Sequence, residues 1–267
     1  MNPSAALVLA TLAGPALAQP EPPAQLAAPA PGSPQTSAAA ADPVTLLAQV
    51  DDDYRHRDEP GRLEEMAARL DEAERLAPGD YGVLWRQARR YFWISDDPKI
   101  ADAEKSKIGK TAWAYADRAT AANPKGVEGW YFAATGMGNY SLGIGIFRAL
   151  GEGIEGKFRD RLKKAEAIDP GFYDGGIPNA WGRFYFKLPW PKYDAEQSEK
   201  YLLAALKVNP ANVRARVYLA DLYRKEGQDR DARAALEKAL DHAPGAYDAP
   251  EERRMQEVAR AELAKMK

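Results

Sequence analysis

The sequence predicts an all-α protein: a right-handed superhelical solenoid of about five helix pairs, closed by a C-terminal capping helix. Three observations support this prediction. Five segments each end in an apolar-patterned stretch that closes on a proline, at Pro78, Pro124, Pro170, Pro210 and Pro244. In all five an alanine stands five residues before the proline, and the prolines recur at intervals of 46, 46, 40 and 34 residues. Because a proline cannot continue a helix, a repeat of this length indicates helical hairpins that bury their apolar faces against one another.

The chain before the repeats is expected to lie outside the folded domain. Residues 1–18 carry no charged side chain, contain an apolar stretch too short to span a bilayer, and end in small residues at Ala16 and Ala18. This pattern is typical of a secretory signal peptide. Residues 19–43 are rich in Pro, Ala, Gln and Ser and predict a disordered tether, because they cannot bury enough apolar surface to fold. We therefore expect an exported protein, periplasmic or secreted, with a helical-repeat domain at 44–267.

The helix pairs follow from the proline-closed endings. We expect them at residues 46–77, 80–123, 126–169, 178–209 and 212–243, with the capping helix at 251–266. The earlier pairs are longer than the last, but their second helices keep the same endings. The final segment is polar and ends in basic residues, as the end of a solenoid requires.

The third pair is unusually rich in glycine. Nine glycines lie between Gly126 and Gly156. Each glycine inside a helix costs about 0.5–1 kcal/mol relative to alanine, so the cluster needs a structural reason. We expect close backbone crossing, or a broken helix near Gly143 and Gly145; the alternative is a wall where a ligand or partner approaches the backbone.

The fourth pair carries the most individual features. Asp174 to Pro178 predicts a tight turn into a helix, and Leu188 to Pro191 predicts the end of that helix. Asp194 and Gln197 form a capping box for the next helix. The prolines on both sides of Trp190 fix the pose of its ring. That ring either covers the core as a lid, which we favour, or is presented to a partner.

The fifth pair identifies the repeat type. It carries Leu219, Ala220, Tyr223, Gly227, Ala232, Leu236, Ala239 and Pro244. This spacing resembles a tetratricopeptide repeat (TPR), a helical hairpin of 34 residues, with Gly227 at the turn. Arg216 stands where the family usually has a bulky apolar residue, so the match is near to the consensus rather than complete.

Aromatic residues gather in the middle of the chain. Of 26 aromatic residues, 22 lie between Tyr81 and Tyr201, including all six tryptophans. The simpler interpretation is that long hairpins need bulky core residues. The other interpretation is that some of these rings, on first helices, line the concave face and bind a partner or an apolar ligand. The candidate binding residues are Trp130, Tyr131, Tyr140, Trp181, Tyr185 and Trp190.

The composition argues against an enzyme. The absence of cysteine excludes disulfides, thiolate nucleophiles, cysteine zinc sites and a lipid anchor, so an exported product should be soluble. Two histidines, His56 and His242, are too few for a three-histidine zinc site. We expect no catalytic, cofactor-binding or metal-binding residue. With 37 basic and 39 acidic side chains, the chain has no electrostatic attraction to nucleic acid. Residues 151–158 resemble a phosphate-binding loop, but their context is helical and Phe158 replaces the Ser or Thr that binds magnesium.

Three stretches of the sequence carry a resemblance to a known family that is more specific than the likeness to the TPR repeat. They are residues 123–134, which include Glu–Gly–Trp–Tyr–Phe–Ala–Ala, residues 175–189, which include Gly–Gly–Ile–Pro–Asn–Ala–Trp–Gly, and residues 194–201. They resemble the T-component family of TRAP transporters, exported helical-repeat proteins of bacteria that associate with the substrate-binding subunits of these transporters. They are also similar to the regulators of microtubule dynamics. The likeness covers about residues 110–245 and implies a protein partner or an apolar ligand, and no reaction.

The sequence therefore supports two functions. The first is an exported, non-enzymatic scaffold whose concave aromatic face holds another protein, such as a transporter substrate-binding subunit. The alternative is a carrier of a small apolar ligand in the aromatic, glycine-rich centre. Neither function involves nucleic acid or a membrane span.

Overall fold

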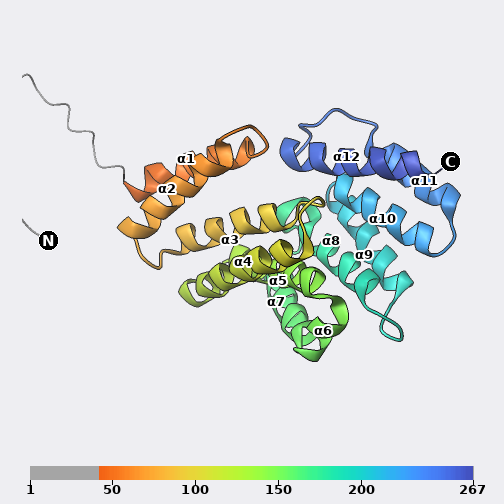
Figure 1. Ribbon diagram of the computed structural model, residues 1–267, viewed down its shortest axis with the longest axis horizontal. Helices are drawn as coiled ribbons and strands as arrows, with labels where there is room; N and C mark the ends of the chain where they lie inside the picture. The colour runs from red at the N-terminus through yellow and green to blue at the C-terminus, as the bar shows by residue number, and fades with distance from the viewer. Residues whose placement is uncertain (1–41, 267) are drawn as a thin grey trace, which may run out of the picture. The chain divides into compact units, whose positions relative to one another are not determined.

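The computed structural model describes residues 42–266, which form twelve α-helices and no strand (Figure 1). The predicted signal peptide and nearly all of the predicted tether lie outside the described residues. None of the described helices is both long and apolar enough to cross a bilayer.

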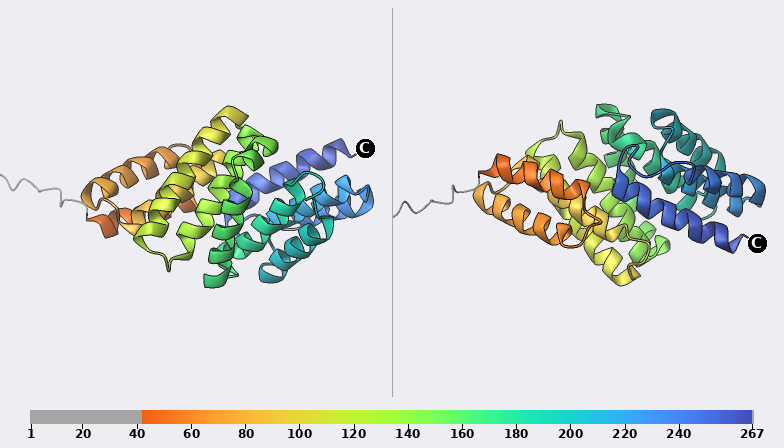
Figure 2. Two further views of the ribbon diagram at one scale, coloured as in Figure 1. Left: turned by 90° about the horizontal axis from the view of Figure 1, so that it is seen from below. Right: turned by 90° about the horizontal axis from the view of Figure 1, so that it is seen from above.

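The helices form five consecutive pairs and a single final helix. Their bounds are α1 Pro43–Arg55 and α2 Arg62–Leu76; α3 Tyr81–Ser95 and α4 Asp102–Ala122; α5 Val127–Ile144, α6 Ile146–Gly151 and α7 Ile154–Ile168; α8 Phe172–Lys187 and α9 Ala195–Val208; α10 Val213–Lys225 and α11 Asp229–Ala239; and α12 Ala249–Lys265. Within each pair the two long helices pack on one another. Figure 2 shows the pairs following one another in chain order. The predicted solenoid of five pairs and a capping helix is confirmed.

The recurring alanine marks the end of the second helix in each pair. The five alanines, Ala73, Ala119, Ala165, Ala205 and Ala239, are all fully buried. In the first four pairs the alanine carbonyl accepts the backbone N–H of the residue that caps the helix, and the proline follows that residue directly. The small side chain lets a neighbouring helix approach closely, and the proline prevents the helix from continuing.

Helices α4 and α5 cross with their backbones in contact. A Cβ atom on Gly136 would lie 2.7 Å from the backbone nitrogen of Trp113, and one on Gly143 would lie 2.5 Å from the carbonyl oxygen of Asp102. These distances leave no room for a side chain. Helix α5 ends where Gly145 adopts a φ of 88°, and the short α6 follows it. The glycine cluster thus provides both the close crossing and the broken helix.

Helix α8 begins with a strained turn. Tyr173, Asp174 and Gly175 have φ angles of 59°, 51° and 87°. A left-handed backbone costs a non-glycine residue about 1–2 kcal/mol, so the turn needs support from elsewhere. Asn212 provides part of it by donating its Nδ2 to the carbonyl oxygen of Asp174 at 2.8 Å. The predicted turn before Pro178 is present, and the helix boundary lies earlier than the expected residue 178.

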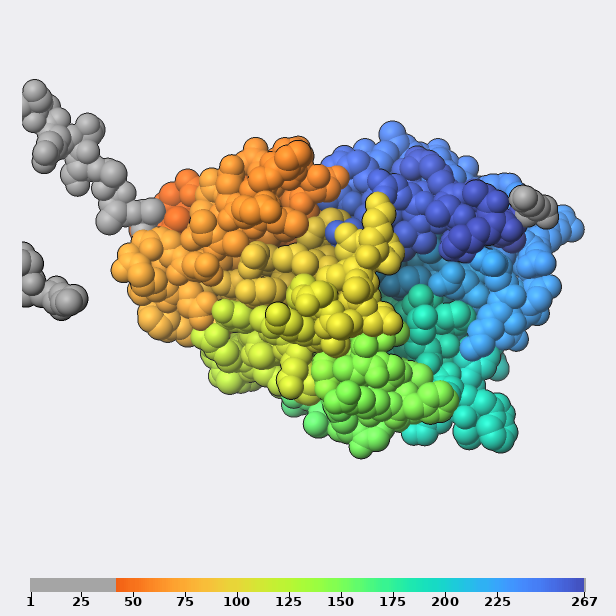
Figure 3. All heavy atoms as spheres, in the orientation of Figure 1, coloured from red at the N-terminus to blue at the C-terminus, as the bar shows by residue number. Residues whose placement is uncertain are grey.

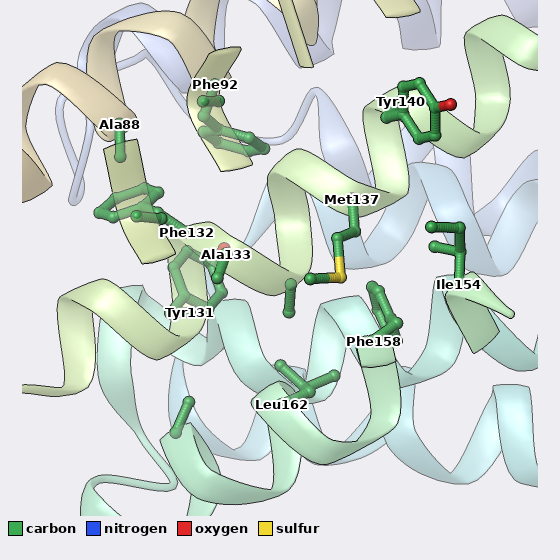
Figure 4. Packing of buried hydrophobic residues seen from close by; sticks show 14 of the residues in the cluster. Ala88, Phe92, Tyr131, Phe132, Ala133, Met137, Tyr140, Ile154, Phe158 and Leu162 are labelled. Atoms are coloured by element: carbon green, nitrogen blue, oxygen red, sulfur yellow. The ribbon is translucent and has the colours of Figure 1, made fainter. Parts of the chain in front are cut away.

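The aromatic centre forms the main hydrophobic core, between α3, α5, α7 and α8 (Figure 4). Phe132 is fully buried, and its ring centroid lies 5.1 Å from that of Tyr131 and 5.8 Å from that of Phe92. Phe158, Met137 and Leu162 fill the space on the other side of α5 (Figure 4). Packing therefore accounts for many of the central aromatic residues.

The loop at residues 188–194 corrects one expectation. Leu188 is buried beneath it, whereas the side chain of Trp190 is 88% exposed. Leu188 is the apolar side chain of this segment that turns into the fold, and the indole ring projects into solvent. The predicted lid is wrong, and the ring is presented on the surface. The capping interaction after the loop is present, since Asp194 accepts the backbone N–H of Gln197 at 2.9 Å.

Candidate binding cavity

The first helices of the repeats surround a cavity of about 330 Å³. Its walls come from α5, α8, α10 and α12, and the end of α3 and the α6–α7 segment complete it. Helix α5 packs on α8, α8 on α10, and α10 on α12, so the inner face of the solenoid is continuous. Figure 3 shows a recess on this face, beside the connection between α3 and α4.

One part of the cavity wall is apolar. It is lined by Leu142, Ile146, Leu150, Ile154, Phe158 and Phe184. These residues come from the C-terminal part of α5, from α6 and α7, and from the end of α8. Phe158 and Phe184 stack with ring centroids 5.0 Å apart. We call this wall the apolar end; it can bury hydrocarbon surface of a ligand.

The opposite part holds buried polar groups with unused hydrogen-bonding capacity. Tyr131, at the start of α5, is 4% exposed, and its hydroxyl makes no hydrogen bond with a described residue. Burial raises the pKa of this hydroxyl, which stays protonated. Asn179 on α8 donates its Nδ2 to Asn212 Oδ1 at 3.2 Å, while its own Oδ1 has no partner among the described residues. We call this region the polar end.

A buried arginine stands at the polar end. Arg214 on α10 donates to Asp96 at 2.6 Å, to the two oxygens of Glu251 at 2.5 and 3.0 Å, and to the Tyr218 hydroxyl at 2.8 Å. Burial raises the pKa of Glu251, but Arg214 outweighs this effect and leaves the pKa below its ordinary value. The carboxylates of Asp96 and Glu251 therefore share one guanidinium.

The N-terminal pair and the C-terminal helix meet beside the polar end. Arg57, just after α1, donates to both carboxylate oxygens of Asp248, the N-cap of α12, at 2.8 and 2.7 Å. Its guanidinium lies 4.0 Å from the ring centroid of Tyr54 and 4.1 Å from that of Trp93. The hydroxyl of Tyr54 lies 2.5 Å from that of Tyr173. We call these contacts the clasp; they support this side of the cavity.

The candidate residues of α5 do not share one face. Tyr131 lines the cavity. Trp130 donates its Nε1 to the carbonyl oxygen of Pro124 at 2.9 Å, and Lys164 of α7 lies 4.2 Å from its ring centroid. Tyr140 donates to Glu152 at 2.7 Å, and its ring packs beside Trp113 of α4 with centroids 6.0 Å apart (Figure 4 shows its place on α5). Because successive helical residues point about 100° apart, Trp130 and Tyr140 lie outside the cavity lining that includes Tyr131.

The candidate residues of α8 pack against the next helix. Trp181 and Tyr185 both stack on Tyr201 of α9, with centroids 5.8 and 5.9 Å apart. Trp181 also donates its Nε1 to Glu166 at 3.2 Å. These two residues therefore lie between α8 and its neighbours rather than on the cavity wall. Whether any of the six candidates binds a partner stays a prediction.

Sequence reasoning missed most of the polar end. Asp174, Asn179 and Arg214 lie far from Tyr131 in the sequence, and only the stacking of the pairs brings them together. The capping role of Asn212 could have been predicted, because an asparagine directly before an apolar helix is a typical N-cap. It does cap α10, where its Oδ1 accepts the N–H of Ala215 at 2.8 Å.

No metal-binding cluster of His, Asp and Glu occurs within residues 42–266. His242 lies 3.1 Å from Glu252, and His56 lies near the end of α1. Residues 151–158, which resemble a phosphate-binding loop, span the junction of α6 and α7, where a helix rather than a strand precedes them.

Solved structures share this succession of helix pairs. The chain is similar to TTC0263, a thermophilic TPR protein of Thermus thermophilus, with a TM-score of 0.63 and 19% identity over 83% of this chain and 99% of that one. The fold is a tetratricopeptide-repeat solenoid. PilF of Pseudomonas aeruginosa is also similar, with a TM-score of 0.50 and 14% identity over 84% of this chain and 93% of that one.

The TPR likeness concerns the fold of the chain. No protein-family model matches the sequence, and no curated protein matches it. The resemblance to TRAP-transporter T-components stays a prediction.

Proposed function

We propose that this TPR solenoid is a non-enzymatic scaffold that binds another protein. The fold supports this proposal, because helical-repeat proteins offer extended surfaces to partners. The observation that carries it is the exposure of two aromatic side chains, Phe147 at 76% and Trp190 at 88%. Large rings are over-represented among the residues that dominate binding energy once a partner buries them.

Both rings lie on segments that are insertions relative to a 34-residue TPR. Phe147 lies on α6, which is inserted into the third pair, and Trp190 lies in the loop after α8. Lys192 of that loop forms an ion pair with Glu155 in the first turn of α7. This contact holds the loop against the segment that directly follows α6. We call α6 and residues 188–194 the insertion surface.

Affinity capture with the full chain as bait tests the insertion surface. A bait with Phe147→Ala and Trp190→Ala together is expected to recover at least about tenfold less partner, since each such truncation costs on the order of 1–2 kcal/mol. Val208→Ala, on an exposed residue of α9, is the matched control and should recover the partner normally. Undiminished recovery by the double variant would overturn the assignment. Baits with Trp130→Ala or Tyr140→Ala test the aromatic residues that the sequence favours.

The cavity supports a second candidate function, carriage of a small ligand with apolar surface. Its volume of about 330 Å³ and its apolar end suit a small-molecule site. Native mass spectrometry of the full chain purified from its own source should show a bound mass that solvent extraction removes. A uniform mass equal to that of the polypeptide would contradict this candidate.

We further propose that the protein is exported and works beside an envelope transporter. The signal-peptide pattern at residues 1–18 and the likeness of residues 110–245 to TRAP T-components support this proposal. Cell fractionation should find the protein in the periplasm or the medium without residues 1–18, and capture should recover a substrate-binding subunit. A full-length product confined to the cytoplasm would contradict export.

A further inference from the structure

We propose that the cavity binds a small organic amine, with its ammonium group at the polar end and its apolar body along the apolar end. This inference rests on the second candidate function, because it requires a ligand in the cavity. It adds the chemical class of that ligand.

The charges around the polar end favour a cation. Four carboxylates line it, those of Asp96, Asp174, Asp248 and Glu251. Three guanidiniums and one ammonium offset them: Arg214 in the wall, Arg57 beside Asp248, and Arg254 and Lys105 near Asp96. Arg214 already donates to Asp96, Glu251 and Tyr218, so it has little capacity left for an anionic ligand. None of these cations offsets Asp174, whose charged neighbours are the carboxylates of Asp248 and Glu252, so the charge around Asp174 attracts an ammonium and repels a carboxylate.

Asp174 is the carboxylate that lacks a partner. Its side chain makes no ion pair and accepts no hydrogen bond within residues 42–266. Asp174 is an exposed residue. Partial burial of its carboxylate raises its pKa, and the nearby carboxylates of Asp248 and Glu252 raise it further. A bound ammonium would offset this repulsion.

Two buried groups beside Asp174, the Tyr131 hydroxyl and the Asn179 amide, can also accept a hydrogen bond from a ligand. The Tyr131 hydroxyl lies against the first regular turn of α8, 2.6 Å from the position of a Cβ atom on Gly176. Asn179 is three residues further along the same helix, on the same face, and both side chains are 4% exposed. Asn179 Oδ1 can only accept a hydrogen bond, so a ligand that satisfies it must carry an N–H or O–H group.

The aromatic rings of the polar end suit an ammonium as well. Tyr131 and Tyr173 lie with ring centroids 5.4 Å apart, and Tyr218 and Tyr247 also line the cavity. Ring faces attract cations, most strongly where water is excluded. The strained backbone of Tyr173 and Asp174 brings a ring and a carboxylate to this place, and such strain is concentrated at binding sites.

The rest of the cavity accepts an apolar body and disfavours a second cation. The six side chains of the apolar end provide hydrocarbon surface. Arg183 and Lys187 also line the cavity, so a diamine or polyamine would meet positive charge along its length. A monoamine with an alkyl or aryl body fits both ends.

Isothermal titration calorimetry of the full chain at pH 7 with octylamine, octanol and octanoate tests the inference. Octylamine is expected to bind at least about tenfold more tightly than the other two probes. Asp174→Asn should weaken octylamine binding about tenfold and leave octanol binding unchanged, because asparagine tolerates the left-handed backbone at this position. Asp229→Asn, on an exposed residue at the start of α11, is the matched control and should change neither. Tyr131→Phe removes only a hydroxyl and should weaken octylamine binding severalfold.

The outcomes separate the two proposals. Octanoate that binds as tightly as octylamine, or an Asp174→Asn variant with unchanged octylamine affinity, overturns the amine assignment. Equal binding of all three probes overturns it as well, while leaving the cavity as an apolar carrier. Binding of none of them overturns both.

Discussion

Among single residues, Glu252 in α12 has the densest set of hydrogen bonds. Its carboxylate is fully buried and accepts the backbone N–H groups of four consecutive residues, 245–248, at 3.0 to 3.3 Å. Burial raises the pKa of Glu252, but these donors outweigh it and leave the pKa below its ordinary value of 4.5. The carboxylate therefore fixes the turn that leads into α12.

Glu252→Gln should lower the free energy of unfolding at pH 7 by about 2–4 kcal/mol, because a neutral amide replaces a carboxylate among N–H donors. A carboxylate whose pKa is lower in the folded than in the unfolded state stabilises the fold when it is ionised. This stabilisation is fully present above the unfolded pKa of about 4.5, and it is lost as the pH falls through the folded-state pKa. Urea unfolding of both proteins should therefore show a difference at pH 7 that shrinks towards pH 3. An equal difference at both pH values would contradict this account.

Lys187, at the end of α8, should make stability rise with pH in the alkaline range. Burial lowers the pKa of Lys187 to about 8, and Arg183 contributes repulsion. Between about pH 8 and 10.5 the unfolded chain binds more protons at this residue than the folded chain, so the free energy of unfolding rises with pH. Lys187→Met should be more stable than the wild type at pH 7, and thermal unfolding should show that advantage disappearing above pH 10.5. A variant less stable at pH 7 would show that the ammonium is stabilised in the fold.

At the scale of elements, the crossing of α4 and α5 depends on glycines where the two backbones meet. Gly136→Ala should lower the free energy of unfolding by about 1–3 kcal/mol, since its Cβ atom would lie 2.7 Å from a backbone nitrogen that cannot move freely. Gly156→Ala in α7 is the matched control. No atom lies within 4 Å of its Cβ position, so it should gain about 0.5–1 kcal/mol. Chemical denaturation measures both, and equal effects would contradict the close crossing.

Some elements could be predicted because their signals are local. The proline-closed endings and the buried alanines gave the five pairs, since a helix end depends on a few neighbouring residues. The pose of Trp190 could not be predicted, because the sequence does not show which of the apolar side chains in the loop, Leu188 or Trp190, turns into the fold. The positions of Trp130 and Tyr140 could not be predicted for a similar reason: the face of α5 that meets the cavity is set by the helices around it.

At the scale of the whole described domain, the clasp joins its first and last helices. Asp248→Asn should preserve the cap of α12, because asparagine is an equally good N-cap, but it leaves the buried Arg57 without its carboxylate. We expect a loss of about 3 kcal/mol in the free energy of unfolding, and faster hydrogen exchange in α1 and α2. Asp58→Asn removes a more exposed ion pair with Arg253 and should cost less than about 1 kcal/mol. Equal losses in the two variants would contradict a role for the clasp in holding the ends together.

The sequence by itself determined the fold class, the number of helix pairs, the proline-closed ends of the second helices in the first four pairs and the glycine-dependent crossing, because these follow from local backbone preferences and a repeated apolar pattern. Only the tertiary structure decided which faces of those helices turn inward and which side chains meet. The cavity with its acidic polar end, the exposed rings of the insertion surface and the clasp all join residues that are distant along the chain. A sequence pattern records that a residue is apolar, aromatic or charged, whereas its neighbours are set by the stacking of whole helix pairs.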